Sequence, residues 1–424
     1  MRCERLALSA AGDATGVAAD IRKLVPPPES VRDGVALIIA TVRAGGDRAV
    51  RDYSRTLDTG GREPQALLVP DAELDAAVAG LDPAVRRGIE RAIRHVEAVA
   101  AAWGSERPEV VVLGENRVIL RRAPVDRAAV YVPGGRAPYP STVLMGVVPA
   151  RLAGVERIAV CSPPRREDGD IDPVILAACR LAGAHAVYRM GGAHAIAALA
   201  YGTESVDAVD VIVGPGNLYV QEAKRQVFGH VGIDGFAGPS DLLLIATGDA
   251  DPRPLALDLL AQAEHGPGTL VVGASDDRRI LDAFEGQLTQ GADTGAVACL
   301  VETPTPEQAL ALAQAFAPEH LQLVGTEAEA LADRATRAGC VFVGAGAGTA
   351  FGDYIAGSNH ILPTNGAARF ASAVSPEHFV RHFSEVHIEA PTELARLAAP
   401  LARAEGFELH ARSMEARIRE NGPR

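Results

Sequence analysis

Short apolar runs alternate with helical stretches through this 424-residue chain, and the alternation constrains the fold more than any other feature. Five runs have the composition and length of strands, at residues 128–132, 158–161, 186–188, 209–213 and 242–246. Helical patterns lie between them, at residues 141–154, 173–183, 193–201 and 218–228. Strands and helices that alternate at this spacing predict βαβ units and a mostly parallel sheet.

The same alternation resumes after Pro252. It predicts helices at 252–264, 277–288 and 306–315, strands at 270–272, 299–302 and 341–344, and a glycine-rich loop at 345–375. We therefore expect an α/β fold with two Rossmann-like parallel-sheet domains, in which no strand is followed by a GxGxxG fingerprint. The boundaries we predict are an N-terminal segment at 1–28, a first, discontinuous α/β domain at 29–130 and 242–375, a second α/β domain at 131–241 and a C-terminal helical extension at 376–424.

The composition excludes some classes of protein and partner. Hydrophobic residues make up 48% and charged residues 22%, as in globular proteins, and the net charge of −13 argues against a nucleic-acid-binding surface. The five cysteines are dispersed without a CxxC motif, which indicates reduced thiols. The N-terminus lacks the pattern of a signal peptide, and no apolar run reaches the length of a membrane span. We expect a cytoplasmic protein without a nucleic-acid or membrane partner.

Four histidines lie close in sequence to a polar or acidic residue, mostly in Gly- or Pro-containing segments. The pairs are Gln262 with His265, Glu319 with His320, Asp353 with His360, and Glu405 with His410. Each pair also has a plain structural explanation, such as a helix end, an exposed turn or a solvated helix face. Together they suggest a borderline metal such as zinc, bound through nitrogen and oxygen, beside a separate acid–base group.

Two glycine-rich turns directly follow predicted strands, at residues 132–135 and 213–217. Such a turn before a helix can bind an anionic group through free N–H groups, although strand-to-helix turns often need glycine for geometry alone. The residues alone are therefore consistent with a dinucleotide site but do not establish one. Ser240 lacks the GxSxG setting of a nucleophile, so we interpret it as a substrate contact or a helix cap.

Several segments together resemble the histidinol dehydrogenase family, over about residue 30 to the end of the chain. They are VYVPGGRAPYPSTVLMG at 130–146, MGGAHAIAALAYGTE at 190–204, VIVGPGNLYVQEAKRQV at 211–227, GIDGFAGPSDLLLIA at 232–246, LLAQAEHGPG at 259–268, FAPEHL at 316–321, FGDYIAGSNHILPT at 351–364 and AEGFELHARSMEARI at 404–418. The resemblance implies a zinc- and NAD-dependent enzyme that oxidises L-histidinol to L-histidine through bound histidinaldehyde, using two NAD. This reaction is the last step of histidine biosynthesis.

The resemblance also implies roles for individual residues. The zinc ligands would be Gln262, His265, Asp353 and His410, with one zinc per subunit and His410 supplied by the partner of an intertwined homodimer that exchanges its C-terminal extension. Glu319 and His320 would be the acid–base pair, and the substrate site would comprise these two residues, the zinc ligands, Ser240, His360 and Glu405. Tyr131, His194 and Asn217 match NAD-binding positions, which assigns the cofactor to the second α/β domain. The family commonly has Gln where this chain has His194, so we expect an altered NAD contact.

Three alternatives remain open at this point. A zinc- and NAD-dependent dehydrogenase of the same family could act on another polar alcohol, such as a sulfonated diol, although Glu405 and the full set of histidines favour histidinol. A non-catalytic binding protein with this fold would be expected to lack the base or the ligands, and none is missing. A zinc hydrolase would not need the paired glycine turns beside the sheet.

Overall fold

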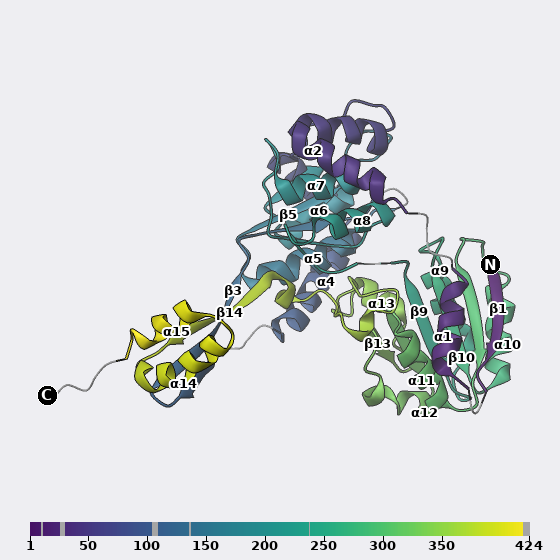
Figure 1. Cartoon of the computed structure of the whole chain (residues 1–424). Helices are drawn as coiled ribbons and strands as arrows, with labels where there is room; N and C mark the ends of the chain where they lie inside the picture. The colour runs from purple at the N-terminus through teal and green to yellow at the C-terminus, as the bar shows by residue number, and fades with distance from the viewer. Residues whose placement is uncertain (10–11, 26–29, 104–108, 135–136, 237, 419–424) are drawn as a thin grey trace. The chain divides into compact units, whose positions relative to one another are not determined.

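The structure, a computed structural model, describes residues 1–9, 12–25, 30–103, 109–134, 137–236 and 238–418 (Figure 1). The chain divides into two compact units. The first comprises Met1–Gly104 and Val125–Phe379, and the second comprises Ser105–Pro124 and Val380–Arg424. In the described ranges, no helix is both long and apolar enough to cross a membrane.

One part of the first unit is a six-stranded parallel sheet with the strand order β1-β11-β10-β9-β12-β13. Its strands are β1 (Arg2–Ala7), β9 (Asp241–Ala246), β10 (Leu270–Ser275), β11 (Val297–Glu302), β12 (His320–Val324) and β13 (Cys340–Val343). Successive residues of β9 pack into two different cores, with Leu242 and Leu244 in one and Leu243 and Ile245 in the other. A strand buried on both faces has this continuous apolar run instead of an alternating pattern.

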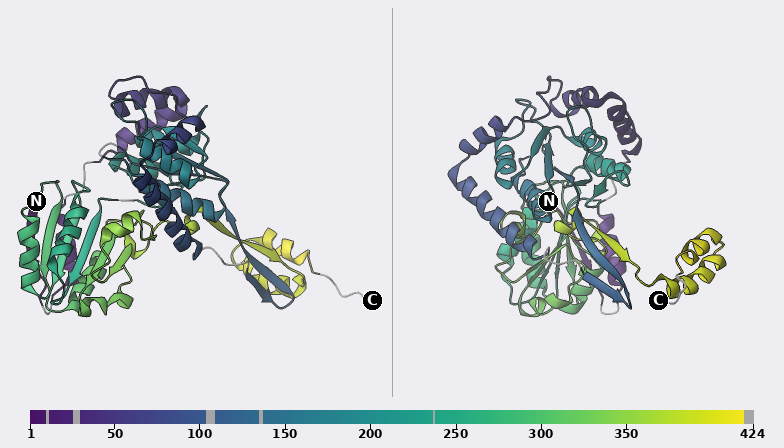
Figure 2. Two further views of the ribbon diagram at one scale, coloured as in Figure 1. Left: turned by 180° about the vertical axis from the view of Figure 1, so that it is seen from behind. Right: turned by 90° about the vertical axis from the view of Figure 1, so that its left-hand side faces the viewer.

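Helices cover both faces of this sheet (Figures 1 and 2). Apolar residues of α1 and α11 join one core, and those of α9 and α10 join the other. The helices around this sheet are α1 (Ala14–Lys23), α9 (Pro252–Ala263), α10 (Arg278–Leu288), α11 (Pro306–Phe316), α12 (Thr326–Glu329) and α13 (Thr349–Tyr354). Short 3-10 turns follow at Ala332–Arg334, Ala367–Arg369 and Pro376–Phe379.

The other part of the first unit is a five-stranded parallel sheet with the order β6-β5-β4-β7-β8. Its strands are β4 (Arg127–Tyr131), β5 (Arg157–Ser162), β6 (Ala186–Arg189), β7 (Val211–Val213) and β8 (Gly232–Ile233). The helices around it are α2 (Arg32–Tyr53), which continues into a π-helical turn (Ser54–Asp58), α3 (Asp71–Ala79), α4 (Pro83–Ala101), α5 (Pro140–Ala153), α6 (Pro173–Ala182), α7 (Gly192–Tyr201) and α8 (Leu218–Val227). The chain runs from β4 through β5 to β6 and then crosses back to β7. The strand order therefore reverses between β4 and β7.

Two predicted domain boundaries need correction. The segment 1–28 contains β1 and α1, and β1 pairs with β11 inside the six-stranded sheet. The predicted boundaries place the helices at 29–103 with that same sheet, but α2, α3 and α4 pack against α7, α6 and α5, respectively, around the five-stranded sheet. β1 is polar and only partly buried, so it lacks the apolar run of an inner strand. An apolar helix face shows that a helix is covered without showing which sheet covers it.

The second unit contains a three-stranded antiparallel sheet with the order β14-β3-β2 and two helices that pack together. Its elements are β2 (Glu109–Leu113), β3 (Asn116–Pro124), β14 (Val380–His387), α14 (Pro391–Ala404) and α15 (Glu408–Glu415). The predicted C-terminal extension is thus α-helical only after residue 390, and it begins with a 3-10 turn and the strand β14. Its first strand pairs with a hairpin from a distant part of the sequence. This pairing is non-local, so no pattern within 376–424 could indicate it.

Candidate active site

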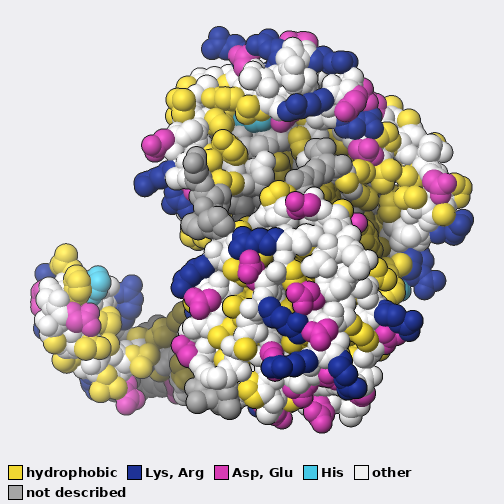
Figure 3. Space-filling model, turned by 90° about the vertical axis from the view of Figure 1, so that its right-hand side faces the viewer, with side chains coloured by type: hydrophobic (Ala, Val, Ile, Leu, Met, Phe, Trp, Pro, Cys, Tyr) yellow, Lys and Arg dark blue, Asp and Glu magenta, His cyan; other side chains and the backbone are white. Residues whose placement is uncertain are grey.

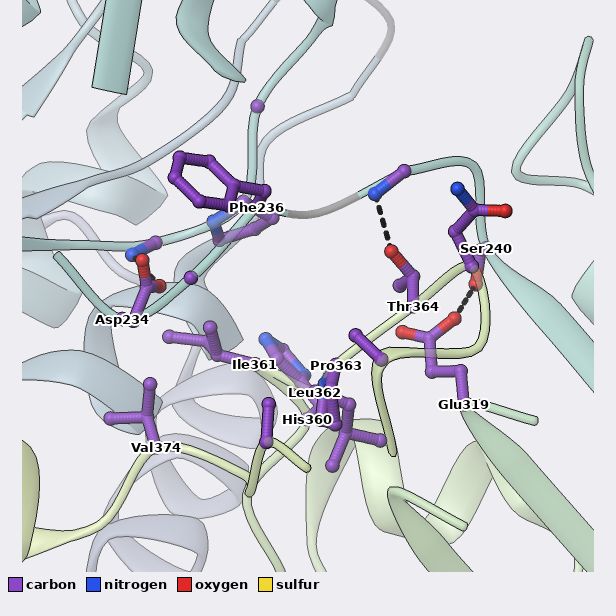
Figure 4. A pocket seen from close by; sticks show the side chains of 18 of the residues that line it. Asp234, Phe236, Ser240, Glu319, His360, Ile361, Leu362, Pro363, Thr364 and Val374 are labelled. Atoms are coloured by element: carbon purple, nitrogen blue, oxygen red, sulfur yellow. Dashed lines mark hydrogen bonds between the residues drawn. The ribbon is translucent and has the colours of Figure 1, made fainter. Parts of the chain in front are cut away.

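A cavity of about 820 Å³ lies in the first unit, and residues from both parallel sheets line it (Figure 4). The five-stranded sheet contributes Pro133 after β4 and the turn 214–217 after β7, so its carboxyl edge faces the cavity. The six-stranded sheet contributes Ser240, Glu319 and His320, which lie at the amino ends of the neighbouring strands β9 and β12. Two strands that pair in parallel thus bring residues about 80 positions apart in sequence to one edge.

The Glu319 carboxyl group is buried among hydrogen-bond donors. It accepts hydrogen bonds from the Ser240 hydroxyl, drawn in Figure 4, and from the backbone N–H of Asp241 at 3.1 Å. Its own backbone N–H donates to Asp241 Oδ1 at 2.7 Å. Burial, with the nearby charge of Asp241 as a second cause, raises the pKa of Glu319 to about 8. Because Glu319 is buried, this segment is not the exposed turn that its sequence also allowed. With this raised pKa, Glu319 is mostly protonated at neutral pH.

His320 is the first residue of β12, and its ring is buried beside two carboxyl groups. Its Nδ1 lies 3.8 Å from Glu319 Oε2, and its Nε2 lies 3.9 Å from Asp353 Oδ1. Burial lowers the pKa of His320, which keeps the imidazole neutral. Within the described ranges, Nδ1 has no hydrogen-bond partner although it is buried. A neutral ring with an uncommitted nitrogen can accept a proton from a bound molecule.

Gln262, Ser240 and Glu319 form a chain of polar contacts. Gln262, in the last turn of α9, donates from Nε2 to Ser240 Oγ at 2.5 Å, and Ser240 in turn donates to Glu319. Gln262 Nε2 also lies 3.2 Å from His265 Nδ1. Burial is the main cause that lowers the pKa of His265, so this ring too is neutral, the form that binds metals.

Asp353 and His360 belong to one segment that follows β13. Burial raises the pKa of Asp353, on α13, to about 6, and the neighbouring His320 opposes this rise. His360 Nδ1 lies 2.9 Å from the Asp353 carbonyl, and His360 Nε2 lies 3.2 Å from Thr142 Oγ1 on α5. Burial lowers the pKa of His360 to about 4. Both residues line the cavity, and the contact with α5 connects this segment to the helices of the five-stranded sheet.

The donor set suits zinc but is incomplete within the first unit. Gln262, His265 and Asp353 offer amide, imidazole and carboxylate ligands, which zinc accepts. Among the described residues, no three His, Cys, Asp or Glu side chains gather closely enough to hold a metal. A zinc ion bound by His265 and Asp353 would therefore need the Gln262 amide as a third ligand and a further ligand from elsewhere.

Of the three predicted cofactor positions, Asn217 lines the cavity, whereas Tyr131 and His194 are buried. Asn217 lines the cavity and caps α8, with its Oδ1 accepting from the N–H groups of Tyr219 at 3.0 Å and Val220 at 3.2 Å. Tyr131 is buried, and its hydroxyl accepts from the Gly192 N–H at 3.1 Å. His194 is fully buried on α7. Its Nε2 lies 3.1 Å from Asp58 Oδ2 and 3.2 Å from Ser54 Oγ, so the imidazole joins α7 to the π-helical turn.

Glu405 and His410 lie in the second unit, where both are exposed. Glu405 follows the last residue of α14, and His410 lies on α15 with its ring stacked on Phe407 at a centroid distance of 5.0 Å. The cavity is lined by first-unit residues.

Sequence reasoning missed the residues that support Glu319. Arg22 on α1 donates to Asp241 Oδ2 at 2.7 Å and to the Phe316 carbonyl at 2.9 Å. Asp241 is buried and holds the backbone of Glu319 through its other oxygen. No pattern in the sequence indicates this link, because 219 positions separate Arg22 from Asp241.

A cavity at the edges of two parallel sheets, lined by a buried Glu–His pair, is typical of an α/β enzyme. A family model described as histidinol dehydrogenase matches residues 26–418. The histidinol dehydrogenases of Parasynechococcus marenigrum and Rhizobium meliloti are 43% and 41% identical to this chain, each over 92% of both sequences. A crystal structure of histidinol dehydrogenase from Elizabethkingia anophelis is similar with a TM-score of 0.89 and 31% identity, over 98% of both chains. The chain belongs to the histidinol dehydrogenase family and is an oxidoreductase of histidine biosynthesis.

Proposed function

We propose that this enzyme oxidises L-histidinol to L-histidine through bound histidinaldehyde, with two hydride transfers to two NAD and a requirement for zinc. The observation that carries the proposal is the buried pair Glu319 and His320, which lines a cavity together with His265 and Asp353. An alcohol oxidised twice needs one group that accepts the hydroxyl proton and one that activates water. The pair supplies both.

The carboxyl edge of the five-stranded sheet fits a dinucleotide. Ligands of open α/β sheets bind where the strand order reverses, and here the turn 214–217 follows β7 at the reversal between β4 and β7. Gly214 has φ +120°, and a Cβ at this position would lie 2.2 Å from the Tyr131 carbonyl oxygen. Asn217 then caps α8, and the positive end of the helix dipole suits a pyrophosphate. In this proposal the turn and Asn217 bind NAD, while Tyr131 and His194 support its site from the interior.

The zinc site in this proposal consists of Gln262, His265 and Asp353 of one subunit and His410 of the partner subunit, with one ion per subunit. Their amide, imidazole and carboxylate donors are ligands that zinc accepts, and the neutral ring of His265 needs no deprotonation. When bound, zinc would orient the imidazole and amine of the substrate, and NAD would accept the hydride in each oxidation.

The residues of the cavity then divide the acid–base work. His320 accepts the hydroxyl proton of the alcohol in the first oxidation. Glu319, in its carboxylate form, accepts a proton from the water that adds to the aldehyde carbon in the second. Ser240 holds the Glu319 carboxyl group, and His360 contacts the substrate together with Glu405 of the partner subunit.

A homodimer follows from this assignment, and the surface of the second unit supports it. Exposed apolar side chains gather on α14 and α15 (Figure 3), with Leu397 69% exposed, Leu401 62% and Leu409 75%. Apolar groups concentrated in this way mark an interaction surface. We propose that a second copy of the chain covers this surface by exchanging the second unit. We also assign the enzyme to the cytoplasm, because all five cysteines are free.

One assay tests the proposal directly. The purified, zinc-loaded enzyme is mixed with L-histidinol and NAD, and NADH is followed by absorbance. We expect two NADH per histidinol, loss of the reaction with a chelator and recovery with zinc. Zinc that stays tightly bound without NADH formation would overturn histidinol as the substrate and direct the same assay to other polar alcohols, such as a sulfonated diol.

A further inference from the structure

Lys224 is an unusual residue for this chain. The sequence contains 41 lysines and arginines, and only Lys23 and Lys224 are lysines. Lys23 lies on α1 with its side chain 74% exposed and pairs with Asp20. Lys224 lies on α8 with its side chain only 1% exposed. A chain that uses arginine almost everywhere thus has a lysine at a buried position, where its compact ammonium group contacts both Gly214 and Asp234.

The Lys224 ammonium group holds the glycine turn that follows β7. It donates to the Gly214 carbonyl oxygen at 3.0 Å and forms a buried ion pair with Asp234, which follows β8. The other oxygen of Asp234 accepts the Gly214 N–H at 2.7 Å. Both polar groups of Gly214 are therefore bound by one ion pair.

The ion pair acts on the part of the turn that has no polar side chain of its own. Gly214 has φ +120° and no side chain to anchor it, and the next residues, Pro215 and Gly216, supply no polar side chain either. Lys224 and Asp234 line the same cavity as the turn, and Figure 4 shows Asp234 at the wall of this cavity. Removing the pair would leave the N–H and carbonyl of Gly214 without these partners, so the turn would lose its fixed orientation.

We propose that the Lys224–Asp234 ion pair is a positioning device for NAD, which orients the turn 214–217 so that its backbone binds the dinucleotide. This inference rests on the proposed function, because it takes NAD as the ligand of the turn. Lys224 and Asp234 act through Gly214 and are positioning residues. Their loss should weaken NAD binding and leave the acid–base chemistry intact.

The variants must separate positioning from folding. Lys224→Met alone leaves the buried Asp234 charge without a partner, which can unfold a protein. The double variant Lys224→Met/Asp234→Asn removes both charges and retains an amide oxygen that can accept the Gly214 N–H. Lys224→Arg keeps the charge with a larger group, and Lys23→Met is the matched control at an exposed lysine.

NAD binding by calorimetry and steady-state kinetics give the first readout. For the folded double variant we expect Kd and KM for NAD to rise about 10- to 100-fold, the range for a lost hydrogen bond to a charged group. The kcat at saturating NAD and the zinc content should stay unchanged. Lys224→Arg should retain part of the affinity, and Lys23→Met should match the wild type. A folded double variant with wild-type KM for NAD would overturn the inference.

Amine acetylation followed by peptide mass spectrometry gives a readout that does not depend on activity. Lys23 should react rapidly, whereas Lys224 should react slowly, more slowly still with NAD, and faster in Asp234→Asn. Rates at Lys224 that respond to neither NAD nor Asp234→Asn would contradict the role of the ion pair. A wild-type enzyme that binds no NAD and oxidises no histidinol would instead overturn the proposed function.

Discussion

At the scale of single residues, burial acts in opposite directions on Glu319 and His320. It raises the pKa of the acid to about 8 and lowers the pKa of the base, because a low-dielectric environment disfavours the charged form of each. The two neighbours therefore do not neutralise each other as an ion pair at neutral pH, although 3.8 Å separates Nδ1 from the carboxyl oxygen. A proton acceptor and a group that can lose its proton near pH 8 remain available side by side.

The raised pKa of Glu319 predicts a pH dependence of aldehyde oxidation. Glu319 must be a carboxylate to activate water, and it is protonated below a pKa of about 8. With histidinaldehyde as the substrate, kcat/KM should rise with pH about tenfold per unit below that pKa and level off above it. Rates measured between pH 6 and 10 check this, and Glu319→Gln should be slow and lack the rise. A wild-type profile that is flat from pH 6 to 10 would rule out this role of Glu319.

Replacing His320 tests the other half of the pair. His320→Ala should lower kcat for histidinol about 100- to 10,000-fold, the usual contribution of a positioned acid–base group. Its zinc content should equal that of the wild type, because His320 is outside the proposed ligand set. Kinetic measurements and metal analysis of the same variant distinguish the loss of an acid–base group from the loss of a zinc ligand. Loss of zinc would mean that His320 binds the metal.

At the scale of elements, the site depends on strands that begin at the same edge. β9 and β12 pair in parallel, so Asp241 and His320 start neighbouring strands, and the loop before each strand supplies Ser240 and Glu319. α1 adds Arg22 from the start of the chain, which pairs with the buried Asp241. The N-terminal segment thus has a role in the site that its sequence does not indicate.

Removing Arg22 should destabilise the enzyme and slow it. Arg22→Met leaves the Asp241 carboxylate buried without its partner, which should lower the free energy of unfolding by about 3 kcal/mol. Turnover should fall because Asp241 holds the backbone of Glu319. Urea unfolding measures the first effect and steady-state kinetics the second. Arg253→Met, at a side chain that is 82% exposed, is the control and should change neither.

At the scale of the whole molecule, the two units differ in what they bury. The first unit has large apolar cores on both faces of each parallel sheet, whereas the described part of the second unit buries few apolar residues and exposes leucines on α14 and α15. In the described part of the second unit, the three strands pair with one another and the two helices pack together. In the proposed homodimer, a partner chain would cover the exposed leucines.

A mixing experiment tests whether the second unit completes the partner's site. His410→Ala should lose zinc and activity, and Glu319→Gln should lose activity while it keeps His410. If subunits exchange their second units, mixed dimers contain one complete site, so mixing equal amounts after dissociation should restore about a quarter of wild-type activity. A mixture as inactive as its two components would show that each subunit completes its own site.

The local elements and the family could be predicted from the sequence. Periodicity predicted the strands and helices of residues 128–302 to within a few positions, except the two-residue strand β8, because apolar patterning and glycine or proline boundaries are local properties. The motifs around Gln262, Glu319 and Asp353 identified the family that the comparisons confirm. Three features became visible only in the folded chain: the sheet that each early helix covers, the place of β1 in the six-stranded sheet, and the burial of His194. The tertiary structure also supplied the pairs Arg22–Asp241 and Lys224–Asp234. These features depend on burial and on contacts between distant segments, and neither leaves a periodic pattern in the sequence.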